Sequence, residues 1–408
     1  MAKYNYDKSV LKGLGVGAFL KETKVRQQHI DEGENTIPTS VYNPNIIAKK
    51  LHPSFQIARI KEIKEDLDAK TFVLVPDDES GINELAYFKA GQYVSIAFQF
   101  DGKSICKPYS LCCSPLKAKG DNDNSYEITI KRKADGFVST YALDNLKVND
   151  KILLSGPLGQ FTYERLRDAK NVIGLAGGSG ITPFVAMAEA IADNEEDFNL
   201  TILYGNKSHD SILLKDRLDE AAKKSNGKVK VVYVLSDEEF EGYESGLLSA
   251  ELIKKYAPNE DYSIFVCGPK AMYKYEEEEL KKLNLPRRRI RYELSGEYGD
   301  PSNDEKYPKE FIGKSFNVKV WIRGESQDVT CQANETLLHA MEMSGIHAPA
   351  DCRSGTCGWC HSRLISGDTY IPESNDGRRL ADKKFGWVHP CSTYPLSDIE
   401  IEIFPIPE

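Results

Sequence analysis

Four cysteines near the C-terminus constrain this chain more than any other feature of its sequence. Three of them lie in the segment CRSGTCGWC at residues 352–360, and the fourth follows downstream. A Cys-x4-Cys-x2-Cys spacing with a distant fourth cysteine is that of [2Fe–2S] ligands. Gly355 and Gly358 suit a loop that must aim three thiolates and several backbone N–H groups at one cluster. A structural zinc site is the alternative, but it normally needs two short cysteine or histidine pairs, and this chain has one. The predicted cluster ligands are Cys352, Cys357, Cys360 and Cys391.

The length and charge of the chain narrow its class. At 408 residues it should fold as two to four domains. Its net charge of −9 argues against nucleic acid as a partner, because phosphate binding needs a basic surface. No apolar run reaches the roughly 18–20 residues of a bilayer span, and the N-terminus has no signal-peptide pattern. Nine cysteines, an odd number, do not suggest a disulfide framework. We therefore expect a cytoplasmic protein.

The pattern along the chain predicts several domains. Residues 53–163 contain short alternating strands separated by turns, which favours an antiparallel β-barrel. Residues 164–296 alternate buried strands with helical segments, which is typical of an α/β domain with a parallel sheet. Residues 297–314, rich in glycine, proline and charge, are the predicted linker to a compact module at 315–408. Residues 1–52 are polar and weakly patterned, and we interpret them as an irregular N-terminal arm of unknown role.

Three short motifs lie in the predicted barrel: KPYS at residues 107–110, TIK at 129–131 and GFVS at 136–139. Each motif alone is common at a strand end or a turn. A glycine such as that at position 136 leaves backbone N–H groups free to face phosphate oxygens. Their value as a signal comes from their order and spacing.

A second group of motifs lies in the predicted α/β domain. The segment GLAGGSGITP at residues 174–183 occurs where a strand meets a helix. Its glycines permit a tight turn, and the helix N-terminus offers a site for a pyrophosphate. The segments YGNK at 204–207 and CGP at 267–269 occur at the ends of later strands.

In this order, the motifs resemble those of the ferredoxin–NADP reductase superfamily. Residues 315–408 resemble plant-type ferredoxins, which implies an α+β β-grasp domain. From about residue 55 onward the chain is similar to reductases of the phthalate dioxygenase reductase and phenylacetyl-CoA oxygenase reductase type. The first 50 residues lie outside this resemblance.

The resemblance implies a role for each motif. Tyr109 would stack on a flavin ring, Ser110 would hydrogen-bond near flavin N5, and Cys267 would border the nicotinamide; Ser110 and Cys267 are therefore the predicted catalytic residues. The predicted cofactor-binding residues are Lys107, Tyr109, Ser110, Thr129, Lys131, Gly136, Val138, Ser139, Gly177, Gly178, Gly180, Thr182, Tyr204, Lys207, Cys267, Gly268 and Pro269.

Two cofactor choices stay open at this point. The family usually has arginine where this chain has Lys107, and a lysine grips phosphate as a point charge instead of through two parallel bonds. FMN is therefore an alternative to FAD, which the Gly-x-x-Ser segment at 136–139 favours. A 2′-phosphate needs a basic cluster, whereas Lys207 is followed by Asp210 and by no arginine before Arg217. We expect NADH, with NADPH as the alternative.

These parts imply an electron-transfer enzyme. A nicotinamide gives up two electrons together, an iron–sulfur cluster takes one at a time, and a flavin can do both. The expected route runs from NADH through FAD and the [2Fe–2S] cluster to a protein acceptor such as an oxygenase. One alternative is an electron-relay subunit of a larger complex. Another is the reverse reaction, because plant-type clusters at about −400 mV lie below the nicotinamide couple.

Overall fold

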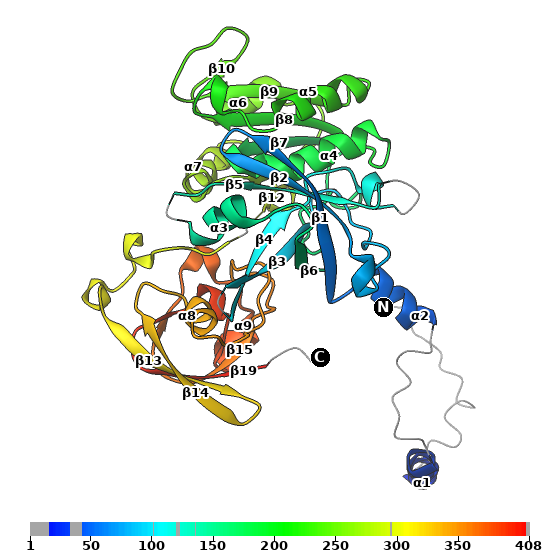
Figure 1. Cartoon of the computed structure of the whole chain (residues 1–408), viewed down its shortest axis with the longest axis vertical. Helices are drawn as coiled ribbons and strands as arrows, with labels where there is room; N and C mark the ends of the chain where they lie inside the picture. The colour runs from blue at the N-terminus through cyan, green and yellow to red at the C-terminus, as the bar shows by residue number, and fades with distance from the viewer. Residues whose placement is uncertain are drawn as a thin grey trace, which may run out of the picture. The chain divides into compact units, whose positions relative to one another are not determined.

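The computed structural model describes residues 16–32, 43–100, 102–119, 123–134, 136–293 and 296–404 (Figure 1). The chain divides into two units, Met1–Lys50 and Leu51–Glu408. The second unit contains the barrel, the α/β domain and the C-terminal domain, and all of the motifs lie in it.

The first unit contains helix where the sequence predicted an irregular arm. Helix α1 spans Val16–Glu32, and α2 spans Asn43–Leu51. Within α1, side-chain amides donate to carboxylates one turn later, from Gln27 to Asp31 at 2.9 Å and from Gln28 to Glu32 at 2.7 Å. The helix has no clear apolar stripe, so the usual periodic signal was absent from its sequence.

The second unit begins with a six-stranded antiparallel sheet in the order β4-β3-β6-β1-β2-β5. An isolated antiparallel bridge between Leu111 and Ile128 joins its two ends, as the predicted barrel requires. Helix α3 (Phe137–Asn145) packs on it through the contact of Phe137 with Phe100. The strands are β1 (Phe55–Asp66), β2 (Ala69–Pro76), β3 (Tyr93–Phe100), β4 (Lys103–Ser110), β5 (Tyr126–Lys131) and β6 (Lys151–Ser155).

The second sheet is wholly parallel, in the order β10-β9-β8-β7-β11-β12, as predicted. The strand order reverses between β7 and β11, and ligands of such sheets bind where the order reverses, outside the carboxyl ends of the strands. The strands are β7 (Asn171–Gly177), β8 (Asn199–Asn206), β9 (Val229–Leu235), β10 (Glu244–Ser245), β11 (Tyr262–Cys267) and β12 (Ile290–Tyr292). The helices are α4 (Thr182–Ala192), α5 (Lys215–Lys224), α6 (Ala250–Tyr256) and α7 (Lys270–Lys281).

The C-terminal domain is built on a five-stranded mixed sheet in the order β14-β13-β19-β15-β17. Its parallel central pair, β13 and β19, lies between antiparallel neighbours, and helix α8 (Leu337–Met343) contributes to the same core. The strands are β13 (Ser315–Ile322), β14 (Glu325–Gln332), β15 (Ser362–Ser366), β17 (Trp387–Val388) and β19 (Ile399–Ile403). A short helix, α9 (Leu380–Lys384), and the strand pair β16 (Thr369–Tyr370) and β18 (Tyr394–Pro395) complete the domain.

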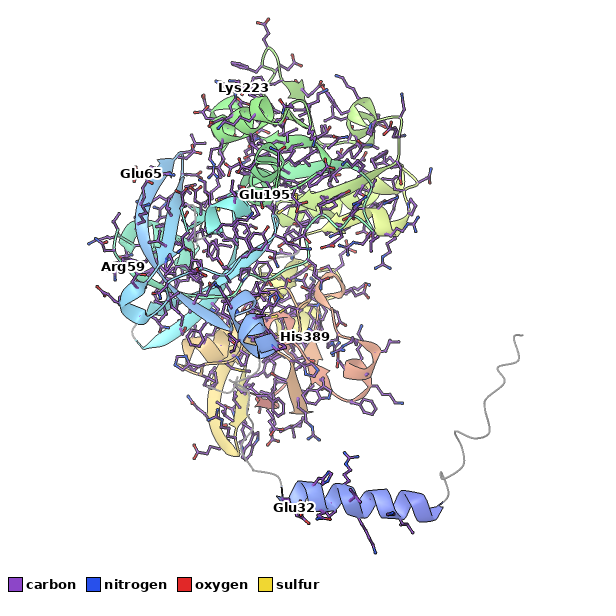
Figure 2. All side chains as sticks on the ribbon, turned by 90° about the vertical axis from the view of Figure 1, so that its right-hand side faces the viewer. Glu32, Arg59, Glu65, Glu195, Lys223 and His389 are labelled. Carbon is purple, nitrogen blue, oxygen red and sulfur yellow. The ribbon has the colours of Figure 1, made fainter. Side chains whose placement is uncertain are left out.

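Polar contacts join the barrel to the α/β domain. Arg217 of α5 pairs with Glu127 of the barrel at 2.8 Å and with Glu189 of α4 at 2.7 Å. Glu195, labelled in Figure 2, pairs with Lys119 of the barrel at 2.8 Å. These charges fix one domain against the other.

The predicted linker at residues 297–314 is packed on the C-terminal domain. The Tyr307 side chain is buried in it and donates to the carbonyl of Ala333 at 3.0 Å. The Tyr394 hydroxyl in turn donates to the carbonyl of Gly299 at 2.7 Å. A segment held in this way acts as a rigid connection, not as a free tether.

Among the described helices, none combines the length and the hydrophobicity that crossing a bilayer requires.

The stability of the α/β domain should depend on pH through Glu276 in α7. This side chain is fully buried, and neither of its carboxylate oxygens has a hydrogen-bond partner among the described residues. Burial, followed by the charge of Glu279, raises the pKa of Glu276 to about 8. An unfolded chain ionises this group near pH 4.5, so each unit of pH above that costs the folded state up to about 1.4 kcal/mol until pH 8.

Replacing Glu276 with Gln should therefore flatten the fall in unfolding free energy between pH 4.5 and 8. Urea unfolding at several pH values measures this slope. The exposed neighbour Glu277 is the control, because Glu277→Gln should leave the slope unchanged. Identical slopes for the wild type and Glu276→Gln would contradict the assignment.

Candidate redox site

The C-terminal domain brings the four predicted cluster ligands together in one loop region. The Cys352 sulfur contacts those of Cys357 and Cys391, and the Cys360 sulfur lies 3.3 Å from that of Cys391. Cys352, Cys360 and Cys391 are buried, whereas Cys357 is exposed. The sulfur atoms thus form a continuous row with one end at the surface.

The backbone of the loop surrounds these sulfurs with N–H groups. The amides of Ser354 and Cys357 both donate to the Cys352 sulfur at 3.4 Å. The amide of Gly355 donates to the Cys391 sulfur at 3.3 Å, and that of Trp359 to the Cys357 sulfur at 3.4 Å. Such donors stabilise negative charge on thiolates and raise the reduction potential of a cluster that they hold.

The donor set fits a [2Fe–2S] cluster. Thiolates are the ligands that iron–sulfur clusters use; all four cysteines are present, and the sulfurs of Cys352, Cys357 and Cys391 accept from backbone amides. Within the described part of the chain, no group of three or more His, Cys, Asp or Glu side chains is arranged to hold a single metal ion.

Left-handed backbone conformations give the loop its shape. Arg353, Gly355 and Gly358 have φ values of 55°, 77° and 76°. A Cβ at Gly355 would lie 2.0 Å from the carbonyl oxygen of Asn375, so only glycine fits there. The buried His389 donates from Nδ1 to the Gly355 carbonyl at 2.6 Å and supports this turn.

The predicted flavin residues of β4 lie at the barrel end nearest the cluster loop. Ser110 is paired in register with Tyr93 of β3, and Tyr109 contacts Phe98 with ring centroids 6.2 Å apart. On the same sheet, the Ser95 hydroxyl donates to the carbonyl of Asp351 at 3.4 Å. Lys107 is largely buried and lies 3.3 Å from Glu297.

The other predicted flavin residues lie on β5 and at the start of α3. Thr129 is buried and hydrogen-bonds Thr71 at 2.8 Å, while Lys131 pairs with Asp68 at 3.4 Å. Gly136 is the N-cap of α3, and the Ser139 hydroxyl donates to its carbonyl at 3.1 Å. Val138 is buried in the barrel core, so its side chain supports the turn from inside.

The predicted nicotinamide residues meet at the carboxyl ends of β7 and β11. A Cβ on Gly180 would lie 2.3 Å from the Cys267 carbonyl oxygen, and one on Gly268 would lie 2.4 Å from the Met272 sulfur. A Cβ on Gly177 would lie 2.9 Å from Pro269. These glycines therefore allow two loops to approach each other where the strand order reverses.

Three further predicted residues take different positions around these loops. Tyr204 is fully buried and donates to the Gly178 carbonyl at 3.0 Å, so it supports the glycine loop from the core. Thr182 donates to the Ser179 carbonyl at 3.1 Å at the start of α4. Lys207 is exposed at the end of β8, where His209 hydrogen-bonds Glu238 at 2.8 Å.

Glu293 is a residue that the sequence motifs did not reveal. It follows β12, is buried, and has a pKa raised to about 8 by burial and by Cys352. Burial is the main cause that raises the pKa of Cys267, and Glu293 raises it further. The pKa of Tyr93 is likewise raised mainly by burial, then by the residues of the cluster loop and last by Glu293. The Tyr273 hydroxyl donates to the Glu293 carbonyl and accepts from the Gly268 amide. Barrel, α/β domain and cluster loop therefore meet around Glu293.

A large polar groove of about 830 Å³ lies elsewhere, between the β1–β2 turn and helices α4 and α5. Its walls carry Arg217, which pairs with both Glu127 and Glu189. No predicted site residue lines it.

The conformation of Gly355 gives a test of the cluster loop. Gly355→Ala should abolish most of the iron and labile sulfide content, because its Cβ would collide with the Asn375 carbonyl. Gly345→Ala is the matched control: its φ of 79° is similar, but no atom lies within 4 Å of its Cβ. It should keep the iron and lose only about 1 kcal/mol of stability. Equal iron in both variants, measured against flavin content, would refute this interpretation.

Three family models match consecutive parts of the chain. An oxidoreductase FAD-binding domain matches residues 55–163, an oxidoreductase NAD-binding domain matches 175–278, and a 2Fe-2S iron-sulfur cluster binding domain matches 320–396. The matches follow the three domains of the second unit in order. They confirm the predicted FAD, nicotinamide and [2Fe–2S] modules.

This chain matches several known relatives over nearly their whole length. The glycine betaine monooxygenase reductase subunit of Chromohalobacter salexigens is 24% identical over 376 residues, which is 88% of this chain and 98% of the relative. The ferredoxin reductase component of Mycobacterium tuberculosis 3-ketosteroid-9-alpha-monooxygenase is 28% identical, covering 83% of this chain and 93% of the relative. One component of the Escherichia coli 1,2-phenylacetyl-CoA epoxidase is 25% identical, with coverages of 86% and 97%.

The fold matches a solved structure over nearly the whole length of that structure. Phthalate dioxygenase reductase aligns with a TM-score of 0.62 at 22% identity, over 86% of this chain and 98% of that one. This agreement concerns the fold, while the domain models identify the modules. The chain belongs to the ferredoxin–NADP reductase superfamily, as an oxidoreductase with a C-terminal plant-type [2Fe–2S] ferredoxin domain.

Proposed function

We propose that this protein oxidises NADH and delivers single electrons, through FAD and a [2Fe–2S] cluster, to a protein acceptor. The observation that supports this most strongly is the contact of the cluster loop with both other domains. The Gly296 amide, just after the last strand of the α/β domain, donates to the Cys352 carbonyl at 2.9 Å, and the Ser95 hydroxyl of the barrel donates to the Asp351 carbonyl at 3.4 Å. A nicotinamide, a flavin and a cluster bound to their respective domains would lie around the same point. When bound, the flavin supplies conversion between paired and single electrons.

The residues of the barrel would bind and orient the flavin. Tyr109 offers a ring face, Ser110 a hydroxyl and Lys107 a positive charge on one strand. The first turn of α3, at Gly136 and Ser139, would receive phosphate oxygens on its amides. Thr129, Lys131 and Val138 would support this surface through β5 and the barrel core.

The α/β domain would hold the dinucleotide at the carboxyl ends of β7 and β11. Gly177, Gly178, Gly180 and Thr182 form the turn into α4, whose N-terminus favours a pyrophosphate. Cys267, Gly268 and Pro269 would border the nicotinamide, with Tyr204 behind the turn and Lys207 at the adenosine end. The four cysteines 352, 357, 360 and 391 would hold the cluster.

The preference for NADH is supported by the acidic character of the adenosine end. Asp210 follows β8, and Asp237 and Glu238 follow β9, with Glu238 held by His209. These carboxylates would repel a 2′-phosphate, while Lys207 alone would attract it.

An oxygenase component is the acceptor that the relatives favour, because two of those described above are named as reductase parts of monooxygenases. We propose a cytoplasmic location for the protein. The exposed ligand Cys357 marks the face from which an electron would leave.

Anaerobic titration of the purified protein with NADH, followed by absorbance and EPR, tests the proposed route. Bleaching of the flavin band together with a reduced-cluster EPR signal is the expected result. A reduced flavin with an oxidised cluster would favour the reverse reaction or the relay subunit. The absence of both centres would overturn the proposal.

The same titration with NADPH tests the coenzyme preference. We expect NADH to be favoured in kcat/KM by about tenfold or more, because like charges facing each other cost several kcal/mol. Glu238→Gln should narrow this ratio, and exposed Glu239→Gln should leave it unchanged. Equal use of both coenzymes by the wild type would contradict the assignment.

Removing one cluster ligand should separate electron transfer through the cluster from electron transfer directly at the flavin. Cys391→Ser should lose cluster-dependent cytochrome c reduction to background while keeping NADH-driven reduction of ferricyanide at the flavin. Cys331→Ser, at a buried cysteine outside the cluster region, is the control and should keep both activities. Full cytochrome c activity in Cys391→Ser would show that electrons bypass the cluster.

A further inference from the structure

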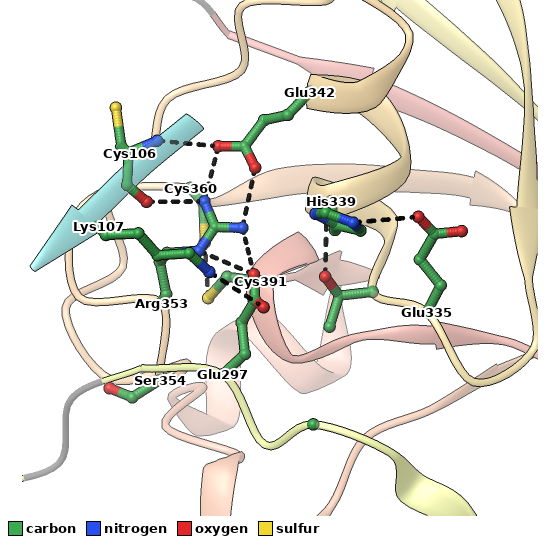
Figure 3. Close-up of polar contacts among 12 residues, drawn as sticks. Cys106, Lys107, Glu297, Glu335, His339, Glu342, Arg353, Ser354, Cys360 and Cys391 are labelled. Carbon is green, nitrogen blue, oxygen red and sulfur yellow. Dashed lines mark hydrogen bonds and ion pairs between the residues drawn. The ribbon is translucent and has the colours of Figure 1, made fainter. Parts of the chain in front are cut away.

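A completely buried arginine lies next to the first cluster ligand. Arg353 donates to the two oxygens of Glu342 at 2.6 and 2.8 Å, to Glu297 through Nε at 2.7 Å, and to the Cys106 carbonyl at 3.0 Å (Figure 3). Its side chain has no exposed surface. Every side of this guanidinium is therefore met by an oxygen acceptor.

The partners of Arg353 come from different domains. Glu342 lies on α8 of the ferredoxin domain, and Glu297 begins the packed segment before that domain. Lys107 lies on β4 of the flavin barrel, with Nζ 3.3 Å from Glu297. The amide of Cys106 also donates to Glu342 at 3.4 Å. Two carboxylates and two cations thus balance their charges across the boundary between barrel and ferredoxin domain.

We propose that Lys107, Glu297, Glu342 and Arg353 form an interdomain network that holds the cluster loop against strand β4. Lys107 lies two residues before Tyr109, and Arg353 directly follows Cys352, so the network joins neighbours of the flavin site and of the cluster. Its purpose for electron transfer rests on the proposed function. The four residues are positioning residues, since they fix the distance between the two sites.

The charges of the network depend on one another. Burial alone would raise the pKa of Glu297, but Arg353 and Lys107 outweigh it and hold this pKa at about 2. Glu297 is therefore ionised at neutral pH. Without its charge, the two cations would face each other in a poorly solvated interface, which favours separation of the domains.

The network also gives a reason for lysine at position 107. An ammonium has three donors, and one of them is directed at Glu297, so others stay available for a flavin phosphate. A planar guanidinium would instead engage one partner through paired bonds. Lys107 can therefore serve both the flavin site and the interdomain network.

Replacement of Glu297 by Gln in the holoenzyme tests the network, with the alkylation rate of Cys106 as the measurement. The partly buried Cys106 side chain packs against the buried cluster of Leu338, Ala350, Cys360 and Cys391 in the ferredoxin domain, so opening of this interface exposes its thiol further. Breaking a buried charge pair should lower the closed-to-open ratio by about 30-fold, which is about 2 kcal/mol at 1.4 kcal/mol per tenfold. Alkylation by N-ethylmaleimide, followed by peptide mass spectrometry, should accelerate by up to this factor.

Glu189→Gln is the matched control. Glu189 also bridges to an arginine and is 19% exposed, compared with 21% for Glu297, but it lies between barrel and α/β domain. It should leave Cys106 alkylation unchanged. Glu297→Asp keeps the charge with a shorter reach and should give a smaller increase than Glu297→Gln. A wild-type alkylation rate in Glu297→Gln, or equal increases for Gln and Asp, would overturn the proposal.

A kinetic readout connects the network to electron transfer. In Glu297→Gln, flavin reduction by NADH should keep its rate, while the following cluster reduction in anaerobic stopped flow should slow. Unchanged cluster reduction with faster alkylation would refute the positioning role. If wild-type protein shows neither flavin nor cluster reduction, the proposed function fails, whereas the alkylation result still decides whether the network exists.

Discussion

A guanidinium without contact to water is the constraint on which the placement of the ferredoxin domain depends. Leaving the charge of Arg353 buried without partners would cost several kcal/mol, so its acceptors must stay in place. These acceptors come from α8, from the segment after the α/β domain and from strand β4 of the barrel. Arg353 also has a φ of 55°, so the residue that joins the domains also turns the loop between Cys352 and Gly355. The shape of the cluster loop and the position of its domain therefore share one physical cause.

The topology of the other two domains directs their motifs to the same place. In the parallel sheet, β7 and β11 are neighbours at the point where the order reverses, so the glycine turn and Cys267 meet. The next strand, β12, ends beside them and continues through Glu293 to Gly296, whose amide donates to the Cys352 carbonyl at 2.9 Å. On the barrel side, Ser110 ends β4 opposite Tyr93. The glycine turn after β7 and the Gly268-Pro269 segment after β11 thus follow strand ends, where backbone groups are not committed to the sheet.

The sequence predicts the parts of this arrangement that depend on local chemistry. The cysteine spacing, the glycine turn and the alternation of strands with helices each reflect constraints within a few residues. The 2Fe-2S module and the parallel sheet are confirmed, and the glycine turn lies between β7 and α4 as expected, while the roles of its residues remain predictions. Lys107 was interpreted as a phosphate ligand, yet its carboxylate partner is 190 residues away in a segment that looked like a flexible linker. Glu342 is buried although glutamate normally lies at the surface, and its pairing with Arg353, together with the donation from the Cys106 amide, explains this.

Two glutamates four residues apart show how far the environment decides their chemistry. Burial, followed by the neighbouring Cys352, raises the pKa of Glu293 to about 8. Glu297 is only partly buried, and Arg353 and Lys107 outweigh the effect of this burial and hold its pKa at about 2. The same side chain is therefore neutral near the meeting point of the domains and anionic in the network beside it. An unpaired charge is unfavourable in such a poorly solvated region. The neutral carboxyl group of Glu293 therefore needs no cation beside it, whereas the ionised carboxylate of Glu297 must be paired with cations. The pairing of Glu297 with Arg353 and Lys107 ties the start of the segment before the ferredoxin domain to both the cluster loop and the barrel.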